Sequence, residues 1–342
     1  MLTKRWLVLS DGALPTEDIY LLESAAPALR DEGFDVGRLG VRGLRWRLAR
    51  WVLSRQMGAN LVICRSLPVY ALRWLERHRD LFGRIVYVID DDIAAAAADD
   101  TLPEAYRKRM GRLASLQPRL LALADVVVAS SEALAARFEE RHRDVRVLTP
   151  SLISPLPDLH HFEQSTWCLG FHGTRAHLAD LQHIASALIH LHDEQSALTM
   201  EVMMGQHTPP ELRGLERVAA PQAKSWRAFQ RHQQAQRLQI GVAPLLDTPF
   251  NRGKSFIKFF DITAMGGVGV YSRRSPYTEI VEDGETGLLV EDCPQAWLEA
   301  LRYLVANPET AKAMAEKAAQ VARERGDPAH AVAFWRALGS EN

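Results

Sequence analysis

Residues 241–290 decide the fold, and they read GVAPLLDTPFNRGKSFIKFFDITAMGGVGVYSRRSPYTEIVEDGETGLLV. The apolar residues 240–245 predict a buried strand, and residues 246–253 predict a polar loop. A helix is expected to start at Ser255, whose hydroxyl can cap its first turn, and a second strand is expected at residues 268–271. The stretch therefore predicts one strand–helix–strand unit of a parallel sheet.

Three charged side chains share one stripe of this predicted helix. Lys254, Lys258 and Asp261 are spaced at i, i+4 and i+7. A helix N-terminus flanked by two lysines can bind an anionic group through backbone N–H groups, the helix dipole and side-chain charge. Asp261 lies one turn further on, where a carboxylate can accept hydrogen bonds from a nucleotide ribose. The alternative is an ordinary solvated helix face with an ion pair, and spacing alone leaves both open.

Several short motifs keep fixed spacings along the same stretch. They are Ala243-Pro244-Leu245, Thr248-Pro249-Phe250-Asn251, Lys254-Ser255, Ile257-Lys258-Phe259, Ala264-Met265-Gly266, Pro276-Tyr277 and Gly284-Glu285-Thr286-Gly287-Leu288-Leu289-Val290. Together they resemble the donor-binding half of GT-B glycosyltransferases of the family-4 type, also called glycosyl transferases group 1. That family commonly has two Glu with seven residues between them. Here Gly253 and Asp261 hold those positions, as in a branch with Asn-x-x-Lys-Ser.

The resemblance implies a nucleotide-sugar donor site on the second half of the chain. Its expected residues are Gly173, Thr174, Arg175, Asn251, Gly253, Lys254, Ser255, Lys258, Asp261 and Glu279. Lys254, Ser255 and Arg175 are assigned to the donor phosphates and Asp261 to the ribose. Asn251, and Glu279 near it, are the candidates for the donor sugar.

The resemblance also predicts the architecture. We expect an α/β protein of the GT-B type, with two facing Rossmann-like domains, each built on a parallel sheet. Residues 1–155 are the expected acceptor-side domain, residues 156–326 the nucleotide-sugar-binding domain, and residues 327–342 a helix that packs back on the first domain. The Pro- and Ser-rich residues 149–159 fit a linker. Single helices are expected at residues 17–31 and 106–123.

Three consecutive acids follow the apolar strand expected at residues 84–89. Asp90, Asp91 and Asp92 lie at the carboxyl end of a parallel strand, where open α/β sheets bind ligands. Asp91 and Asp92 are the candidates to bind acceptor hydroxyls or to assist proton transfer, and Asp91, Asp92 and Lys254 are the catalytic candidates. The alternatives are an Asp-x-Asp metal site and simple capping of the following helix.

Residues 38–55 carry a cluster of positive charge. Six arginines, and no acid, occur there: Arg38, Arg42, Arg45, Arg47, Arg50 and Arg55. Leu44, Leu48, Trp51 and Val52 would form the apolar face of a helix. Such a helix is suited to an anionic membrane surface, and the alternative is a domain helix whose apolar face packs on the sheet.

Composition sets the remaining limits. The 342 residues are 47% hydrophobic and carry a net charge of −1, which permits two packed domains and gives no bulk attraction to nucleic acid. The three cysteines are far apart and suggest no disulfide framework. His183, His190 and His192 lack the Cys or acid partners of a metal site, and neither a metal nor another cofactor is expected. No apolar run reaches the ~20 residues of a membrane span. A cytoplasmic protein is expected, with peripheral contact at the inner membrane face as an option.

These features predict a glycosyltransferase that moves a sugar from a nucleotide-sugar donor to a glycan, lipid-linked or other envelope acceptor. The resemblance implies transfer with retention and without a metal. Two alternatives stay open: an epimerase-type enzyme that acts on nucleotide sugars with the same fold, and a catalytically degenerate subunit that binds the donor.

Overall fold

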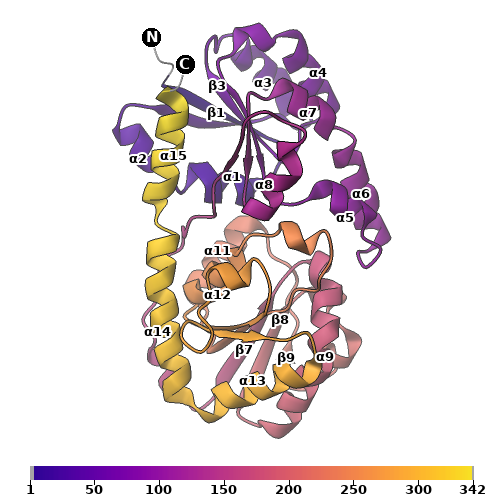
Figure 1. Cartoon of the computed structure of the whole chain (residues 1–342), viewed down its shortest axis with the longest axis vertical. Coiled ribbons are helices and arrows are strands. Elements are labelled where there is room, and N and C mark those ends of the chain that lie inside the picture. The colour runs from indigo at the N-terminus through magenta and orange to yellow at the C-terminus, as the bar shows by residue number, and fades with distance from the viewer. Residues whose placement is uncertain (1–3, 341–342) are drawn as a thin grey trace.

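A computed structural model describes residues 4–340, which form two lobes that each contain a six-stranded parallel sheet. The first sheet has the order β2-β1-β3-β4-β5-β6 and the second the order β12-β11-β10-β7-β8-β9. Figure 1 shows the lobes stacked along the long axis, with the N-terminal lobe at the top. The outermost residues of the expected domains, 1–3 and 341–342, lie outside the described part of the chain.

The strands are short and mostly buried, as both faces of each sheet are covered. In the N-terminal lobe they are β1 (Arg5–Ser10), β2 (Asp35–Gly40), β3 (Asn60–Cys64), β4 (Ile85–Ile89), β5 (Val126–Ala129) and β6 (Val145–Val147). In the C-terminal lobe they are β7 (Trp167–His172), β8 (Leu198–Met203), β9 (Val218–Ala219), β10 (Ile240–Ala243), β11 (Val268–Ser272) and β12 (Leu288–Val290). The strands predicted at 240–245 and 268–271 are confirmed, the first in a shorter form.

Helices connect the strands in both lobes. Those of the N-terminal lobe are α1 (Leu14–Glu17), α2 (Ala26–Asp31), α3 (Arg45–Leu53), α4 (Val69–Arg77), α5 (Ile93–Ala98), α6 (Glu104–Ala114), α7 (Gln117–Leu123) and α8 (Glu132–Glu139). Those that follow are α9 (Leu178–Glu194), α10 (Pro210–Arg213), α11 (Trp226–Ala235), α12 (Ile257–Ala264), α13 (Pro294–Ala306), α14 (Pro308–Arg325) and α15 (Pro328–Ser340). No helix within residues 4–340 is long and apolar enough to cross a membrane.

Two of the long helices predicted from sequence are broken in the structure. Residues 17–31 form the end of α1, a π-helical turn η1 (Asp18–Leu22) and α2, which has a proline at its start. Residues 106–123 are divided between α6 and α7, again with a proline in the first turn of the second helix. Pro27 and Pro118 lack the backbone N–H that a continuous helix needs, so each starts a new helix instead.

The sheet of the N-terminal lobe separates two apolar layers. Side chains that alternate along the strands pack on opposite faces; Leu9 and Tyr87 face one layer, and Trp6 and Val88 face the other. The C-terminal helices close the second layer, because Trp335 of α15 is fully buried there, 5.1 Å from Trp6 between ring centroids. This confirms the expected helix that returns to the first domain.

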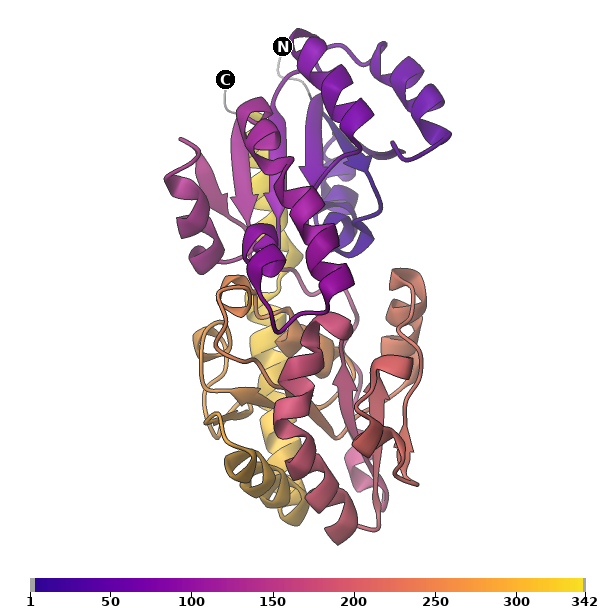
Figure 2. The ribbon, with the colours of Figure 1, turned by 90° about the vertical axis from the view of Figure 1, so that its right-hand side faces the viewer.

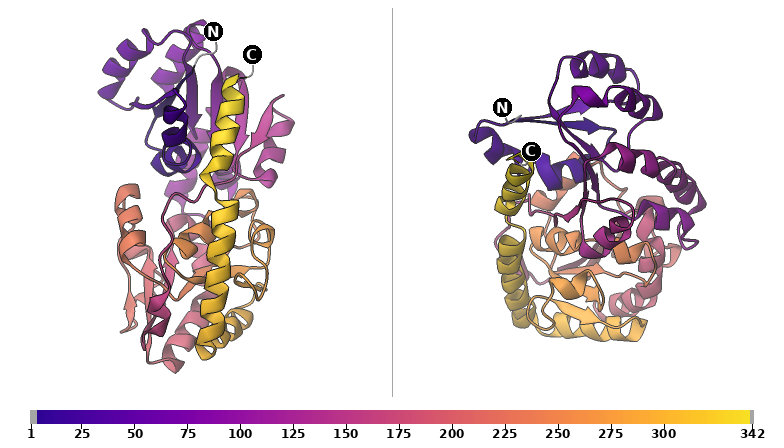
Figure 3. Two further views of the ribbon diagram at one scale, coloured as in Figure 1. Left: turned by 90° about the vertical axis from the view of Figure 1, so that its left-hand side faces the viewer. Right: turned by 45° about the horizontal axis from the view of Figure 1, so that its top comes forward.

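The last two helices tie the lobes together. Figure 1 shows α14 along the C-terminal lobe and α15 continuing along the N-terminal lobe, and the turned views in Figures 2 and 3 show the same path. The Trp335 indole donates a hydrogen bond to the main-chain oxygen of Tyr20 at 2.6 Å. A second connection runs through the loop after β10, whose side chains enter the N-terminal lobe.

Candidate functional site

The loop after β10 forms the centre of the site. It leads through a 3₁₀ turn, η6 (Asn251–Gly253), into α12. The prediction that Ser255 caps this helix is wrong, because α12 begins at Ile257 with Phe256 at the N-cap position. Lys254 is extended where η6 ends, and the buried Phe256 ring packs edge-on against Phe260, so the chain turns into the helix two residues later than expected.

Phe250 anchors this loop in the opposite lobe. Its side chain is fully buried and belongs to the same apolar cluster as Leu134 of α8 and the inner residues of β3 and β4. Gly253 follows at a close approach: a Cβ there would lie 3.2 Å from the Cβ of Asp92. The hydroxyl of Ser131 also donates to the main-chain oxygen of Gly253 at 3.3 Å. The predicted donor loop is therefore fixed against the predicted acceptor domain.

Lys254 forms an ion pair across the two lobes. Its Nζ lies 2.6 Å from Asp91 Oδ1 and 4.1 Å from the centre of the Phe250 ring. Arg65 binds the other oxygen of Asp91 and also pairs with Asp90. Burial opposes ionisation of Asp91, but Lys254 and Arg65 outweigh it and hold the pKa of the carboxyl below its ordinary value. Asp91 is therefore an anion near neutral pH, and two cations compete for it.

Asp92 caps the following helix, which was one of the alternatives in the sequence analysis. Its Oδ1 accepts a hydrogen bond from the N–H of Ala95 at 2.9 Å and so caps α5. Asp90 does not share this contact; its carboxylate accepts a hydrogen bond from the Thr16 hydroxyl at 2.7 Å. Asp90 and Asp92 thus have separate partners, and their arrangement gives no support to an Asp-x-Asp metal site.

A buried network connects the turn after β7 with the donor loop. Asp180 accepts hydrogen bonds from Asn251 Nδ2 at 3.0 Å and from the N–H of Leu246 at 2.9 Å. Its other oxygen lies 2.9 Å from Nδ1 of His177. Burial and the charges of Lys254 and Lys258 hold the pKa of His177 below its ordinary value, although Asp180 acts in the other direction. His177 is therefore a neutral imidazole beside two cations at neutral pH.

Asn251 is consequently a loop-fixing residue. Its side chain is buried, and its amide group also donates to the main-chain oxygen of Leu246 at 3.0 Å. The amide oxygen is buried and has no hydrogen-bond partner among residues 4–340. Contact between Asn251 and a donor sugar remains a prediction, and it would use this oxygen.

Lys258 and Asp261 lie on one face of α12, as their spacing predicts. Lys258 Nζ lies 3.1 Å from Asp261 Oδ2 and 2.6 Å from the main-chain oxygen of His172. The other Asp261 oxygen accepts a hydrogen bond from Gln233 Nε2 at 2.9 Å. The ion pair that was the alternative in the sequence analysis is therefore present, and Lys258 also contacts the end of β7.

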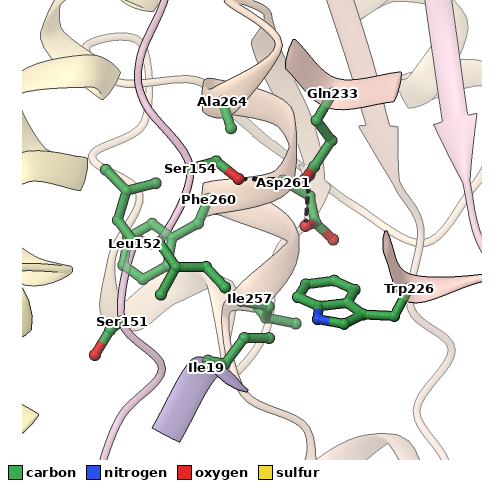
Figure 4. A pocket seen from close by; sticks show the side chains of 11 residues that line it. Ile19, Ser151, Leu152, Ser154, Trp226, Gln233, Ile257, Phe260, Asp261 and Ala264 are labelled. Carbon is green, nitrogen blue, oxygen red and sulfur yellow. Dashed lines mark hydrogen bonds between the residues drawn. The ribbon is translucent and has the colours of Figure 1, made fainter. Parts of the chain in front are cut away.

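Asp261 lines a small pocket between α11, α12 and the interdomain linker. Figure 4 shows its carboxylate beside Gln233, with Trp226 and Ile19 lying across the hollow. Ile19 belongs to the N-terminal lobe, so the pocket borders both domains. The Trp226 indole donates to Asp18 of the same lobe at 2.7 Å. The carboxylate at 261 is thus directed to the region between the lobes.

The remaining predicted residues are divided between two places. Gly173 and Thr174 connect β7 to the turn η4 (Arg175–His177), and the Thr174 hydroxyl caps this turn by accepting a hydrogen bond from the Ala176 N–H. Gly173 is required by packing, because a Cβ would lie 2.7 Å from the Phe171 ring. Within residues 4–340 the Arg175 guanidinium has no hydrogen bond or ion pair. Glu279 is exposed and accepts a hydrogen bond from the Ser275 hydroxyl, and within residues 4–340 no hydrogen bond or ion pair joins it to the loop.

Several site residues could not be found by sequence analysis. Arg65 is a non-glycine residue with φ of 63°, a strained conformation that is often associated with function. Asp180 and Gln233 carry no local motif that marks them as neighbours of the loop. A cluster of His172, Glu201 and His232 also forms on the sheet face below α11, from residues far apart in the sequence.

The architecture is that of the GT-B glycosyltransferases, which comparison with solved structures confirms. Residues 215–337 match a family model described as glycosyl transferase-like. No curated protein matches the sequence. The family match covers the donor loop, α12 and the return of the chain toward the first lobe.

Three solved structures illustrate the fold. HepE from Anabaena, in complex with UDP and glucose, is 15% identical with a TM-score of 0.66 over 98% of this chain and 100% of that chain. Sucrose-phosphate synthase from Thermosynechococcus elongatus is 12% identical with a TM-score of 0.69 over 98% of each chain. A glycosyltransferase from Rickettsia africae is 10% identical with a TM-score of 0.64 over 98% of this chain and 97% of that chain. At these identities the similarity shows the fold.

Proposed function

We propose that this protein is a glycosyltransferase that moves a sugar from a nucleotide-sugar donor to a glycan or lipid-linked acceptor. The observation that carries the proposal is the placement of Lys254, Lys258 and Asp261 on one short segment at the boundary of the two lobes. The glycosyl transferase-like family match over residues 215–337 includes this segment. The solved complex of HepE with UDP and glucose supports a uridine nucleotide as the first donor to test.

The proposed donor contacts follow from charge and position. Lys254, Lys258 and Arg175 supply positive charge near the start of α12, where backbone N–H groups also favour an anion. Lys254 can exchange Asp91 for a phosphate oxygen, since the Arg65 guanidinium still neutralises Asp91. Asp261 can exchange its Gln233 bond for ribose hydroxyls. Positive charge at the leaving diphosphate stabilises the transition state, and we propose that no metal is needed for this step.

Asp91 is better suited to bind cations and orient hydroxyl groups than to abstract a proton. Its lowered pKa makes it a weak base, because a general base is most effective with a pKa near the working pH. We therefore assign it to the orientation of Lys254 and of acceptor hydroxyls. Asp92, which caps α5, positions the strand end beside it. Transfer with retention of anomeric configuration remains part of the proposal.

A thermal-shift screen of the full chain against nucleoside diphosphate and monophosphate sugars tests donor binding. A ligand that binds only the folded protein raises its melting temperature, so one donor class should stand out. Incubation of that donor alone, with product analysis, then separates a transferase from an epimerase. Donor binding without transfer to any cell-extract acceptor would identify a degenerate subunit instead.

The acceptor side includes an unusual surface on α3. The exposed large apolar residues of the described chain are Leu44, Leu48, Trp51, Met57, Val69, Tyr70 and Tyr303. All but the last lie within residues 44–70, and Tyr70 of α4 contacts the start of α3, because its hydroxyl accepts a hydrogen bond from the Gly43 N–H at 2.9 Å and its ring lies 5.6 Å from that of Trp46. We call these six residues the α3 patch. The helix buries Ala49 and Leu53 instead, so the alternative, in which the apolar face packs on the sheet, does not hold for Leu44, Leu48 and Trp51.

Positive charge surrounds this patch. Arg42, Arg45, Arg47, Arg50 and Arg55 are exposed, and Arg55 stacks 4.0 Å from the Trp51 ring. Arg38 does not belong to the patch, because it pairs with the buried Glu17 at 2.7 Å and with Asp18. Exposed arginines beside exposed Leu and Trp suit an anionic bilayer surface, where each basic residue contributes about 1 kcal/mol. We propose that α3 holds the enzyme at a membrane that carries a lipid-linked acceptor.

Liposome sedimentation tests this surface. Binding is expected with vesicles that contain anionic lipid, and it should weaken at high salt. A variant with Arg42, Arg45, Arg47, Arg50 and Arg55 changed to Ser should lose it. The matched control changes Arg107 and Arg112 of α6, which lie outside the patch, to Ser. Equal binding by both variants would refute the proposed surface.

A further inference from the structure

His172, Glu201 and His232 come together on the face of the second sheet that α11 covers. β7 and β8 pair in parallel with Gly170 opposite Glu201 and His172 opposite Met203. Side chains two residues apart share a face, so His172 and Glu201 lie diagonally on the same face. His232 reaches them from α11. Three residues from three elements therefore converge through tertiary packing alone.

Their ligand atoms are already close. Glu201 Oε1 lies 2.6 Å from His172 Nε2 and 2.7 Å from His232 Nε2. One ligand atom from each residue fits within 4.8 Å of the other two. The side chains are largely withdrawn from water, with 7%, 20% and 11% exposed in the order His172, Glu201, His232. A metal bonded at ~2.0–2.2 Å to each needs only a small withdrawal of the carboxylate.

The charges also suit a cation. Glu201 is the one acidic side chain of the cluster, and its Oε1 lies against the Nε2 atoms of both imidazoles. Each imidazole can bind a metal ion through a nitrogen lone pair when the ring is neutral. Lys258 adds one positive charge nearby, but its Nζ is bonded to a main-chain oxygen and paired with Asp261.

We propose that His172, Glu201 and His232 form a binding site for a divalent transition-metal ion of the zinc type. Two imidazoles and one carboxylate are a ligand set that Zn²⁺ accepts, with a fourth position open to water. Each imidazole would bind through Nε2 and carry its proton on Nδ1. The site is separate from the Lys254–Asp91 pair, so it does not supply the metal of an Asp-x-Asp donor site.

The ion would fix α11 to the sheet. His232 is adjacent to Gln233, which bonds Asp261, and Trp226 of the same helix lines the pocket. His172 directly precedes the Gly173 turn. A bound ion therefore holds two walls of the candidate donor site at a fixed distance from each other.

Metal titration of the full chain tests this site without reference to transfer activity. After dialysis against chelator, one equivalent of Co²⁺ should give visible ligand-field absorption without a thiolate charge-transfer band, and calorimetry should show one Zn²⁺ per chain. His232→Gln keeps a donor for Glu201 and should retain the fold, yet weaken Zn²⁺ binding by about 100-fold or more, because it removes a direct ligand. His190→Gln changes an exposed histidine of α9 and should bind like the parent.

Three results would overturn the proposal. The first is that the folded parent does not bind Zn²⁺ saturably. The second is that His232→Gln binds Zn²⁺ as tightly as the parent, and the third is a thiolate band in the Co²⁺ spectrum. Circular dichroism of His232→Gln shows whether a loss of binding reflects a lost ligand or a lost fold. If that variant unfolds, Glu201→Gln serves as the second test, with the same expected loss of affinity. Nucleotide-sugar binding is measured separately, so failure of one proposal leaves the other intact.

Discussion

The interdomain joint and the α3 surface use the same residue types in opposite ways. At the joint, Lys254 is half-buried and Trp335 is buried, and each has a defined partner, Asp91 for the lysine and the Tyr20 main chain for the tryptophan. On α3, Trp51 is 55% exposed and the arginines around it face solvent. Buried groups contribute strongly to stability, whereas exposed charges are screened and exposed apolar groups gain little until a partner covers them. The contacts at the joint hold the two lobes together, whereas the exposed residues of α3 are free to contact the proposed membrane surface.

Trp335→Ala should produce the largest loss of stability. The side chain is fully buried and packs edge-on to Trp6, so its removal leaves a cavity between α15 and the first sheet. We expect the free energy of unfolding to fall by about 3–5 kcal/mol. Urea denaturation followed by circular dichroism measures this, and a loss under about 1 kcal/mol would show that α15 does not lock the lobes.

Lys254→Ala should cause the largest loss of activity. It removes the proposed phosphate contact and leaves Arg65 as the remaining cation at Asp91. We expect kcat/KM for the donor identified by screening to fall by about 10²–10³-fold. Lys108→Ala, at an exposed lysine of α6, is the control and should retain parental rates. Near-parental activity in Lys254→Ala would place the phosphates elsewhere.

Asp261→Asn should weaken nucleotide binding more than it weakens the fold. The amide keeps the shape and can still bond Gln233, but it loses the charge that suits two ribose hydroxyls. We expect about 10-fold weaker binding of the nucleoside diphosphate, because hydrogen bonds to charged groups contribute about 1.5–3 kcal/mol and the amide retains part of that. Calorimetry with ribose and 2′-deoxyribose nucleotides is the measurement. If parent and variant prefer the ribose nucleotide over the 2′-deoxyribose nucleotide to the same degree, Asp261 does not bind the ribose.

A smaller effect is expected from pH. His161 is buried, with Nε2 2.9 Å from the main-chain oxygen of Leu238 and a buried Nδ1 that has no partner within the described chain. Burial and Arg237 lower its pKa, while the Leu238 and Gly266 carbonyls and Asp158 oppose them. In the unfolded chain the imidazole has its ordinary pKa of 6.5, so the stability gained from the lowered pKa of His161 is present above that pH and is lost as the pH falls toward the folded pKa.

Denaturation at about pH 7.5 and about pH 5.5 measures this dependence. His161→Gln should show a smaller decrease in stability between these conditions than the parent. His160→Gln is the matched control, because the neighbouring His160 side chain is 80% exposed. The same decrease in all three proteins would assign the pH dependence to other groups.

Trp51→Ala should change stability least. Its indole is more than half exposed, so we expect a change in the free energy of unfolding within about 0.5 kcal/mol, while binding to anionic vesicles decreases. The comparison with Trp335→Ala is direct, because both variants remove an indole. A stability loss of several kcal/mol at Trp51 would mean that α3 packs within the protein.

Much of the fold and the centre of the site could be predicted from local patterns. The 241–290 stretch predicted β10, the loop, a helix and β11, because apolar periodicity and glycine-rich turns are local properties. The position of Asp261 relative to Lys258 followed from helical geometry. The start of α12 could not be predicted in this way, because the docking of Phe250 in the other lobe sets the path of the chain through Lys254.

Other expectations failed or stayed open for a tertiary reason. The sequence left open whether Leu44, Leu48 and Trp51 pack on the sheet or face outward, and the structure shows them exposed while α3 buries Ala49 and Leu53. The sequence indicated that Asp92 was either a functional acid or a cap, and only the structure shows the cap bond to Ala95. Amphipathic spacing states which residues share a face, and only packing decides what covers it.

The sequence by itself determined the two-domain α/β architecture and the motifs of the loop after β10, because strand and helix periodicity and fixed motif spacings act between near neighbours in the chain. Only the tertiary structure decided that Lys254 meets Asp91, that Asp180 joins His177 to Asn251, and that His172, Glu201 and His232 converge. Those contacts join residues from different sheets and helices. Their geometry depends on how whole layers pack, and no local pattern encodes it.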